Sequence, residues 1–441
     1  MTNMTNMSHA SGVGRKALSW LGLSSLVLSS LAVFAAAPVA QASPAAVHVG
    51  VVAPFTGSQA FIGGFFGDAC SAAAYVIDQA GGVRGHQLSC THVDNTGDPA
   101  DAGPNVARAL ATDSNLDLAV GLDSATAAVT VPLFENANIP LMTLNGLSEY
   151  DGNTNPYFWR VEPDDTIEGA ALAAYALQRH FTKVATVFAN LGSAQSEVTG
   201  AITGLKKLHI KNVISLTVPT DAVSYESEVV RVLATHPQAI IVDGDPQTET
   251  TFFTQYKQLS TGKMPPPIIT STDLLSTSFT TNMKKNVSAS FVRNDIAFIG
   301  YYFSNNVTAM KQYRNALDKL LPKKQAATDL TLSGLPTEYD GVIIAALAMT
   351  MAKSTTGHVY NADILKVTEP NKKATVVHTY SEGVAALKEQ KQIQYVGVDG
   401  AFDFNKSHNV SGRFQVFAQT SGSSTVTIAT VEPTLVTKAT K

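Results

Sequence analysis

The sequence predicts an α/β protein made of two successive lobes, each with a parallel sheet flanked by helices. Short apolar runs alternate with helical patterns from residue 47 onward, and the same alternation restarts after Arg160. The chain of 441 residues is also long enough for two or three domains. Repeated strand and helix units with short connections favour parallel strands, because each helix carries the chain back to the start of the next strand.

The first lobe begins with a strand at residues 47–52, which ends at Pro54, Thr56 and Gly57. A helix at 65–79 follows, since apolar residues recur there every three or four positions until Gly81 and Gly82 interrupt them. The same reasoning predicts strands at 88–93, 116–120 and 139–143, and helices at 102–112 and 125–136.

The second set of elements begins after Arg160. We expect helices at 166–179, 197–207, 225–235 and 248–259, alternating with strands at 183–188, 212–217, 239–242 and 267–271. The C-terminal part is expected to hold a strand at 296–302, helices at 308–321, 338–353 and 379–389, and two paired strands at 396–404 and 413–418 around a polar turn.

The N-terminal 42 residues have the pattern of a secretion signal. Arg15 and Lys16 precede an apolar run at 17–37, and Ala40-Gln41-Ala42 supplies the small residues of a cleavage site after Ala42. An uncleaved membrane anchor is the alternative, because the apolar run is nearly long enough to span a bilayer. We expect an exported, periplasmic protein.

Cys70 and Cys90 are the only cysteines. In an oxidising compartment an even count favours a disulfide, whereas two buried thiols are the alternative. Neither cysteine has the setting of a catalytic nucleophile.

Composition and motifs argue against several classes of function. A net charge of −4 offers no basic field for nucleic acid. The sequence has no phosphate-binding Gly-Lys-Ser/Thr loop, no His-Glu-x-x-His pair and no Gly-x-Ser-x-Gly elbow. Among the carboxylate pairs, Asp164-Asp165 is the strongest candidate for acid/base catalysis. Its place before a predicted helix suits a helix cap equally well. We therefore expect no enzyme, no metal and no cofactor.

Small polar residues follow several predicted strands. Thr56-Gly57-Ser58, Asp123-Ser124, Asn145-Gly146 and Asp273 stand at these strand ends. Ligands of open α/β sheets bind at the carboxyl ends of strands, so these residues suit a small polar or zwitterionic ligand. Each of them also suits a turn or a cap.

Several segments together resemble the periplasmic solute-binding proteins of the leucine/isoleucine/valine type. They occur in the family's order from about residue 47 to 418 and are Ala53-Pro54-Phe55-Thr56-Gly57 with Gly63, Asp78-Gln79-Ala80-Gly81-Gly82-Val83-Arg84-Gly85, Asp94-Asn95-Thr96-Gly97-Asp98-Pro99, Tyr157-Phe158-Trp159-Arg160, Tyr339-Asp340-Gly341 and Gly400-Ala401-Phe402-Asp403-Phe404.

The resemblance implies the type I periplasmic binding fold, with two Rossmann-like lobes joined by three hinge crossovers. It implies a signal peptide at 1–42, a first lobe at 43–163 and 296–385, a second lobe at 164–295 and 386–430, and a tail at 431–441. It also implies that the protein captures an amino acid of the branched-chain type as a monomer and delivers it to the permease of an ABC transporter.

The resemblance further implies particular ligand contacts. The first-lobe residues that hold the ligand carboxylate in the family match Ser124, Asn145 and Gly146. Leu147 stands where family members have a threonine, and Leu191-Gly192-Ser193-Ala194 stands where a tyrosine is expected. The family's hinge-side aspartate matches Asp165, and its second-lobe acid matches Asp273. The apolar wall of its ligand pocket matches Ile62, with Phe61 as an alternative.

Two other functions stay open. The chain could be a ligand-sensing module for amides, urea or aromatic acids that reports to a receptor. It could also be an exported α/β enzyme, although no catalytic pattern was found. Ligand-induced closure without turnover would favour binding.

Overall fold

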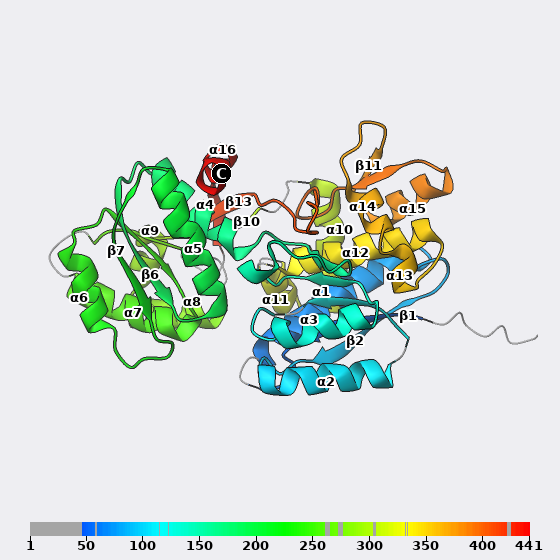
Figure 1. Cartoon of the computed structure of the whole chain (residues 1–441), viewed down its shortest axis with the longest axis horizontal. Helices are drawn as coiled ribbons and strands as arrows, with labels where there is room; N and C mark the ends of the chain where they lie inside the picture. Colours follow the sequence, from blue (N-terminus) through cyan, green and yellow to red (C-terminus); the bar gives the residue numbers. More distant parts are fainter. Residues whose placement is uncertain are drawn as a thin grey trace, which may run out of the picture. The chain divides into compact units, whose positions relative to one another are not determined.

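The computed structural model describes residues 46–57, 60–113, 115–121, 123–260, 265–271, 277–302, 306–330, 332, 334–420 and 425–441 (Figure 1). Within several helices and strands some side chains are not described, Phe61 and Ile62 among them. The predicted secretion signal at 1–42 and its cleavage site lie outside the described residues.

The first sheet is parallel throughout, with the strand order β2-β1-β3-β4-β5. Strand β5 is absent from the sequence prediction because its three residues are too few to show a period. The strands are β1 (Val47–Ala53), β2 (Leu88–Asp94), β3 (Leu116–Gly121), β4 (Leu141–Thr143) and β5 (Phe158–Arg160).

Helices cover both faces of this sheet. Val49 and Val51 pack with α1 and α12 on one face, whereas Val52 packs with α2 and α3 on the other. Helix α12 is buried on all sides over its first 15 residues. The helices of this lobe are α1 (Ala60–Gln79), α2 (Pro99–Thr112), α3 (Ala127–Asn136), the short η1 (Ser148–Tyr150), α10 (Val307–Leu320), α11 (Lys323–Asp329), α12 (Leu335–Ala352), α13 (Gly357–Tyr360), α14 (Asp363–Thr368) and α15 (Tyr380–Lys388).

The second sheet has the order β14-β13-β10-β9-β8-β6-β7. Five consecutive strands of this sheet, from β10 to the edge strand β7, are parallel to one another, and β13 runs antiparallel to β10 and β14. Consecutive residues of β9 pack on opposite faces, since Ile268 joins one core and Ile269 the other. The strands are β6 (Lys183–Ala189), β7 (Lys211–Val218), β8 (Ala239–Asp243), β9 (Ile268–Ser271), β10 (Ile296–Tyr301), β13 (Phe414–Gln419) and β14 (Thr425–Thr430).

Helices α4 and α5 pack closely on one face of the second sheet. A Cβ on Gly169 would lie 1.9 Å from the Glu197 carbonyl oxygen, and a Cβ on Gly200 would lie 1.9 Å from the Thr166 carbonyl oxygen. Glycine at both positions therefore allows the two backbones to touch. The helices of this lobe are α4 (Asp165–Gln178), α5 (Gly192–Lys207), α6 (Glu226–Ala234), α7 (Pro246–Leu259), α8 (Thr277–Asn286), α9 (Ala289–Asp295) and α16 (Pro433–Thr440).

The division between the lobes differs from the expected one at two boundaries. Strand β10 was expected in the first lobe, because residues 296–385 were assigned to it. In the structure β10 pairs with β9 in the second sheet. Residues 386–410, expected in the second lobe, lie with the first, where Tyr395, Phe404 and Val410 join its core. The chain thus crosses between the lobes after β5, after β10 and before β13. Local patterns do not reveal which of two sheets a strand joins.

Two expectations for the C-terminal region were wrong. Residues 396–404 form only isolated bridges, at Val396 and Phe404, and do not pair with β13. The strand there is β12 (Ile393–Tyr395), which pairs with β11 (Thr375–Val377). The expected tail at 431–441 forms α16, whose Val436 and Ala439 are buried against the core of the second lobe.

A disulfide joins Cys70 on α1 to Cys90 on β2. The two Cα atoms lie 6.2 Å apart, which is within the range of unstrained bridges. The bond fastens α1 to an edge strand of the first sheet.

Candidate functional site

The carboxyl edge of the first sheet brings Ser124 and Asn145 together. Strands β3 and β4 are parallel neighbours, so the residues that follow Gly121 and Thr143 emerge side by side. The Ser124 hydroxyl donates to Oδ1 of Asn145 at 3.4 Å. This contact joins two of the residues that the resemblance implied as ligand contacts.

Asn145 is fully buried and holds the loop after β4 in shape. Its side-chain oxygen Oδ1 accepts a hydrogen bond from the backbone amide of Leu147 at 2.9 Å. Its backbone amide donates to the Thr143 hydroxyl at 3.0 Å. Within the described part of the chain, Nδ2 of Asn145 has no hydrogen-bond partner. Because an unpaired buried donor costs free energy, this amide group is suited to meet an acceptor oxygen from outside the chain.

Gly146 lies against the start of α4. Its carbonyl oxygen accepts the Asp165 amide at 2.9 Å, and a Cβ at this position would lie 1.7 Å from Oδ1 of Asp165. The Asp165 side chain is buried. The structure thus brings Gly146 and Asp165 together, and the contact joins the loop of the first lobe to the first helix of the second.

The next two residues of the loop contact α5. A Cβ on Gly192 would lie only 3.2 Å from Cδ2 of Leu147. The Ser148 amide donates to the Ser196 hydroxyl at 3.2 Å, and that hydroxyl also donates to the Ser148 hydroxyl at 3.3 Å. Leu147, which stands where the resemblance implied a threonine, therefore lies against Gly192 of the segment where it implied a tyrosine, and the glycine leaves room for the leucine.

The second sheet carries carboxylates at its carboxyl edge. The Ser271 hydroxyl at the end of β9 donates to Oδ1 of Asp243 at the end of β8, at 2.8 Å. Behind them the Thr270 hydroxyl donates to Glu249 at 3.0 Å. Burial, and then the charge of Asp243, raise the pKa of Glu249 well above its usual value.

Asp243 and Glu249 are not among the site residues predicted from the sequence. The signal for Asp243 was present, since Asp243-Gly244-Asp245 directly follows an apolar run, as Asp123-Ser124 nearly does. Glu249 gave no such signal, because it lies inside a helix and only packing buries it.

Three predicted contacts fall outside the described residues or side chains. Asp273 lies outside the described residues. Phe61 and Ile62 belong to the first turn of α1, and their side chains are not described.

Asp164 serves as a helix cap, which was one of the two interpretations of the carboxylate pair. Its Oδ1 accepts the Ile167 amide at 2.8 Å at the start of α4. Burial, and then the charge of Asp151, raise the pKa of Asp164 to about 6. The Asp164 carboxyl also lies 3.9 Å from the buried guanidinium of Arg160.

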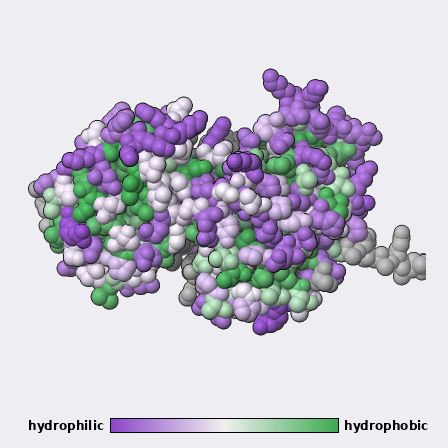
Figure 2. Space-filling model, viewed as in Figure 1, coloured by the Kyte–Doolittle hydropathy of each residue, from purple (hydrophilic) through white to green (hydrophobic). Residues whose placement is uncertain are grey.

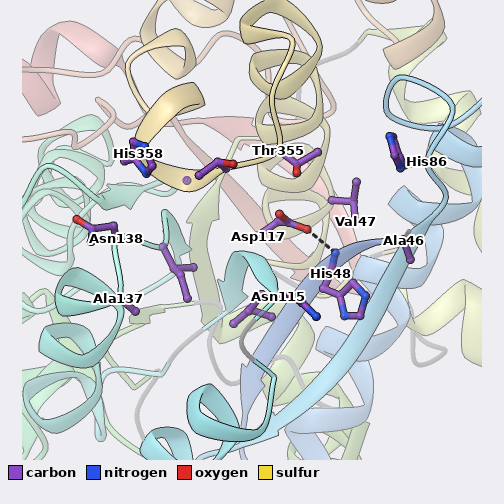
Figure 3. Close-up of a pocket in the computed structure, with 14 residues that line it drawn as sticks. Ala46, Val47, His48, His86, Asn115, Asp117, Ala137, Asn138, Thr355 and His358 are labelled. Atoms are coloured by element: carbon purple, nitrogen blue, oxygen red, sulfur yellow. Dashed lines mark hydrogen bonds between the residues drawn. The ribbon is translucent and has the colours of Figure 1, made fainter. Parts of the chain in front are cut away.

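A cavity of about 530 Å3 lies at the opposite, amino edge of the first sheet. Figure 3 shows Asp117 between His48 and Thr355, with His86 on one side and His358 on the other. The Asp117 carboxylate accepts the His48 amide at 2.9 Å. None of the predicted ligand contacts lines this cavity, so its size does not identify it as the predicted site.

The described residues contain no group of three or more His, Cys, Asp or Glu side chains that could hold a metal ion. Among those same residues, no helix is both long and apolar enough to cross a bilayer. Figure 2 shows a mixed surface in which hydrophobic and hydrophilic residues alternate. Val230 on α6 is one of the exposed large hydrophobic residues, at 55% exposure. Scattered exposure of this kind does not by itself mark a docking surface.

The family profile described as periplasmic binding protein matches residues 46–423. A Leu/Ile/Val-binding protein homologue of Brucella melitensis is 34% identical over 107 residues, which make up 24% of this chain and 28% of that relative. The aligned segment thus spans less than a third of the relative's length.

Solved structures of low sequence identity share the fold. The substrate-binding protein LivJ of Streptococcus pneumoniae, solved with isoleucine, has a TM-score of 0.66 at 18% identity, covering 87% of this chain and 99% of its own. A solute-binding protein of R. palustris in complex with 4-hydroxybenzoate has a TM-score of 0.67 at 16% identity, covering 87% and 96%. A fatty acid transporter substrate-binding protein of Thermomonospora curvata has a TM-score of 0.68 at 15% identity, covering 89% and 94%.

Proposed function

Because this chain belongs to the periplasmic binding protein family, we propose that it captures a small polar ligand between its two lobes and delivers it to the permease of an ABC transporter. One observation supports this proposal most directly. The polar carboxyl edges of two separate sheets are brought together where Leu147 and Ser148 contact α5. Ligands of open α/β sheets bind at such edges.

The side chains at these edges favour a ligand that carries both an acceptor oxygen and a positively charged nitrogen. Ser124 and Asn145 supply hydroxyl and amide donors on the first lobe. Asp243 supplies a carboxylate on the second lobe, and Asp273 follows the neighbouring strand in the sequence. An amino acid meets both requirements, and we propose the branched-chain type as the first to test.

The proposed ligand contacts are those that the resemblance implied, with one addition. The ligand carboxylate meets Ser124, Asn145 and Gly146. The ligand nitrogen meets Asp165, Asp273 and the one added residue, Asp243. The apolar part of the ligand meets Phe61, Ile62 and Leu147.

The proposed mechanism needs no covalent step. A ligand that touches both lobes stabilises the closed arrangement only by the difference between its affinities for the closed and open forms. Closure removes water from the charged groups, so that each hydrogen bond between ligand and protein becomes stronger.

We also propose that the protein is exported and cleaved after Ala42. The mass of the protein recovered from the periplasm tests this directly, because cleavage predicts an N-terminus at Ser43. Recovery of the uncleaved chain in the membrane fraction would favour the anchor instead.

Thermal unfolding of the chain from Ser43 onward, with a panel of amino acids, amides and small carboxylates, tests the ligand class. A ligand at about 100 times its dissociation constant adds about 2.7 kcal/mol and raises the unfolding midpoint. A shift with leucine, isoleucine or valine supports the proposal. A shift with benzoate or another small carboxylate alone would overturn the proposed ligand but not the fold.

A further inference from the structure

Arg160 is a buried cation at the end of β5, at the point where the chain first leaves the first lobe. Its side chain has no exposed surface. One guanidinium nitrogen, Nη1, donates to Oδ1 of Asp151 at 2.8 Å, and the other, Nη2, donates to the Leu147 carbonyl oxygen at 2.7 Å. Burying an arginine is costly unless such partners compensate it, so these contacts hold the guanidinium in one orientation.

The Leu147 carbonyl belongs to the loop that carries the proposed ligand contacts. In this loop the Asn145 side chain holds the Leu147 amide from one side, while Arg160 holds the Leu147 carbonyl from the other. The same carbonyl also accepts the amide of Tyr150, the last residue of η1, at 3.1 Å. The position of Leu147 is therefore set by hydrogen bonds to both its amide and its carbonyl group.

Asp151 extends the contacts of Arg160 to the second lobe. Its Oδ2 accepts the hydroxyl of Thr166, in the first turn of α4, at 3.3 Å. Its carbonyl oxygen accepts Nδ2 of Asn409 at 3.1 Å, and the Arg160 amide donates to the His408 carbonyl oxygen at 2.9 Å. Residues 408 and 409 lead into β13, so the first and the third crossovers meet at Arg160.

We propose that Arg160 is a positioning residue that couples the ligand loop at 145–148 to the two crossovers that meet beside it. This inference rests on the proposed function, since it assigns to Arg160 the task of keeping that loop in its binding geometry when the lobes move. Arg160 itself touches no ligand in this scheme and acts through Leu147 and Asp151.

The contacts favour arginine over lysine for a geometric reason. The planar guanidinium presents two nitrogens in a fixed fork, so it reaches a carboxylate and a carbonyl at the same time. A lysine ammonium keeps the charge but is a single point at the end of a flexible stem. The variant Arg160→Lys therefore preserves the charge and removes the link between Leu147 and Asp151.

Amide hydrogen exchange of the protein without ligand tests the coupling. For Arg160→Lys we expect exchange to rise about tenfold or more for the amides of residues 147–153, with little change in β1 and β3. Two controls accompany it. Arg179→Lys alters an arginine whose Nη1 donates to the Tyr175 hydroxyl, away from the loop, and Tyr360→Phe removes a buried hydrogen bond to the Asp117 carbonyl at the opposite edge.

The pattern of exchange decides the proposal. A rise confined to residues 147–153 and 405–411, absent from both controls, supports it. A uniform rise across the first lobe, including β1 and β3, would show a merely structural role, and no rise would show that Arg160 does not hold the loop. Either result would overturn the proposal.

A titration with isoleucine then separates this proposal from the proposed function. If isoleucine binds, Arg160→Lys should weaken its affinity about tenfold, whereas Tyr360→Phe should leave it unchanged. Equal affinities of Arg160→Lys and the unaltered protein would overturn the coupling. If isoleucine does not bind the unaltered protein, the ligand assignment fails, while the exchange experiment still decides the role of Arg160.

Discussion

The backbone of Gly146 lies so close to Asp165 that a Cβ at residue 146 would stand 1.7 Å from Oδ1 of the aspartate. Gly146 belongs to the loop after β4, whereas Asp165 opens α4. The Asp165 amide also donates to the Gly146 carbonyl oxygen at 2.9 Å. The approach of these two residues joins the lobes at the edge of the proposed site.

Replacement of Gly146 by alanine should separate this contact. Because no atom fits at 1.7 Å, either the loop or α4 must move, and we expect Gly146→Ala to lower the unfolding midpoint by several degrees. Gly152→Ala is the matched control, since a Cβ there meets nothing within 4 Å. Equal midpoints for the two variants would show that the contact is easily relaxed.

Replacement of Ser124 by alanine should affect binding more than stability. The half-buried hydroxyl makes one long hydrogen bond, to Asn145, and its loss should cost the fold little. Loss of a hydrogen bond to a charged ligand group weakens affinity by about tenfold or more. Calorimetric titration with the ligand from the thermal panel measures this, with Ser71→Ala on α1 as the control. Unchanged affinity in both Ser124→Ala and Asp273→Asn would remove these residues from the site.

Replacement of Asp164 by asparagine should change the dependence of stability on pH. Burial raises the pKa of this carboxyl to about 6 in the folded protein, so the folded state binds the proton more tightly than the unfolded state does. The stabilisation is therefore fully present below the unfolded pKa of about 3.9 and is lost as the pH rises through 6.

Asparagine keeps the helix cap without the charge. Asp164→Asn should thus be the more stable protein at pH 7.5, by roughly 3 kcal/mol at most, and the advantage should disappear near pH 4. Thermal unfolding across this range measures the difference, with the exposed Asp101→Asn as the control. A variant that is less stable at pH 7.5 would mean that attraction to Arg160 outweighs burial.

Reduction of the Cys70–Cys90 disulfide should destabilise the first lobe. The bond closes a loop across a sequence separation of 20 residues. The loop-entropy model gives about 3 kcal/mol for a loop of this length. Unfolding in denaturant with and without a reductant measures the loss, and the double variant with Cys70→Ala and Cys90→Ala should not respond to reductant. A midpoint that is unchanged by reduction would show that packing alone holds α1 on β2.

Local patterns in the sequence were sufficient for most of the fold. The alternation of apolar runs and helical spacing predicts β1, β2, β3 and β4 with the helices between them, and it predicts β6 to β9 equally well. Most of these strands lie beside the strand that precedes or follows them in the sequence, although β1 separates β2 from β3 and β6 separates β7 from β8. The pattern missed β5, β11 and β12, which have three residues each, and it also missed β14.

The candidate site was only partly predictable. Ser124 and Asn145 follow consecutive strands of one parallel sheet, so their meeting could be expected from the sequence. The roles of Arg160 and Glu249 could not, because their partners Leu147 and Thr270 lie 13 and 21 positions away, which no helical or strand period connects to them.

The order of strands and helices, the polar strand ends and the family resemblance are thus properties of the sequence, since each depends on residues close together in the chain. Only the tertiary structure decided that β10 belongs to the second sheet, that residues 386–410 return to the first lobe, and that Leu147 lies against Gly192. Those outcomes depend on which surfaces bury each other after the chain has crossed between the lobes. Burial of that kind is shared among separate segments of the chain, and no single segment determines it.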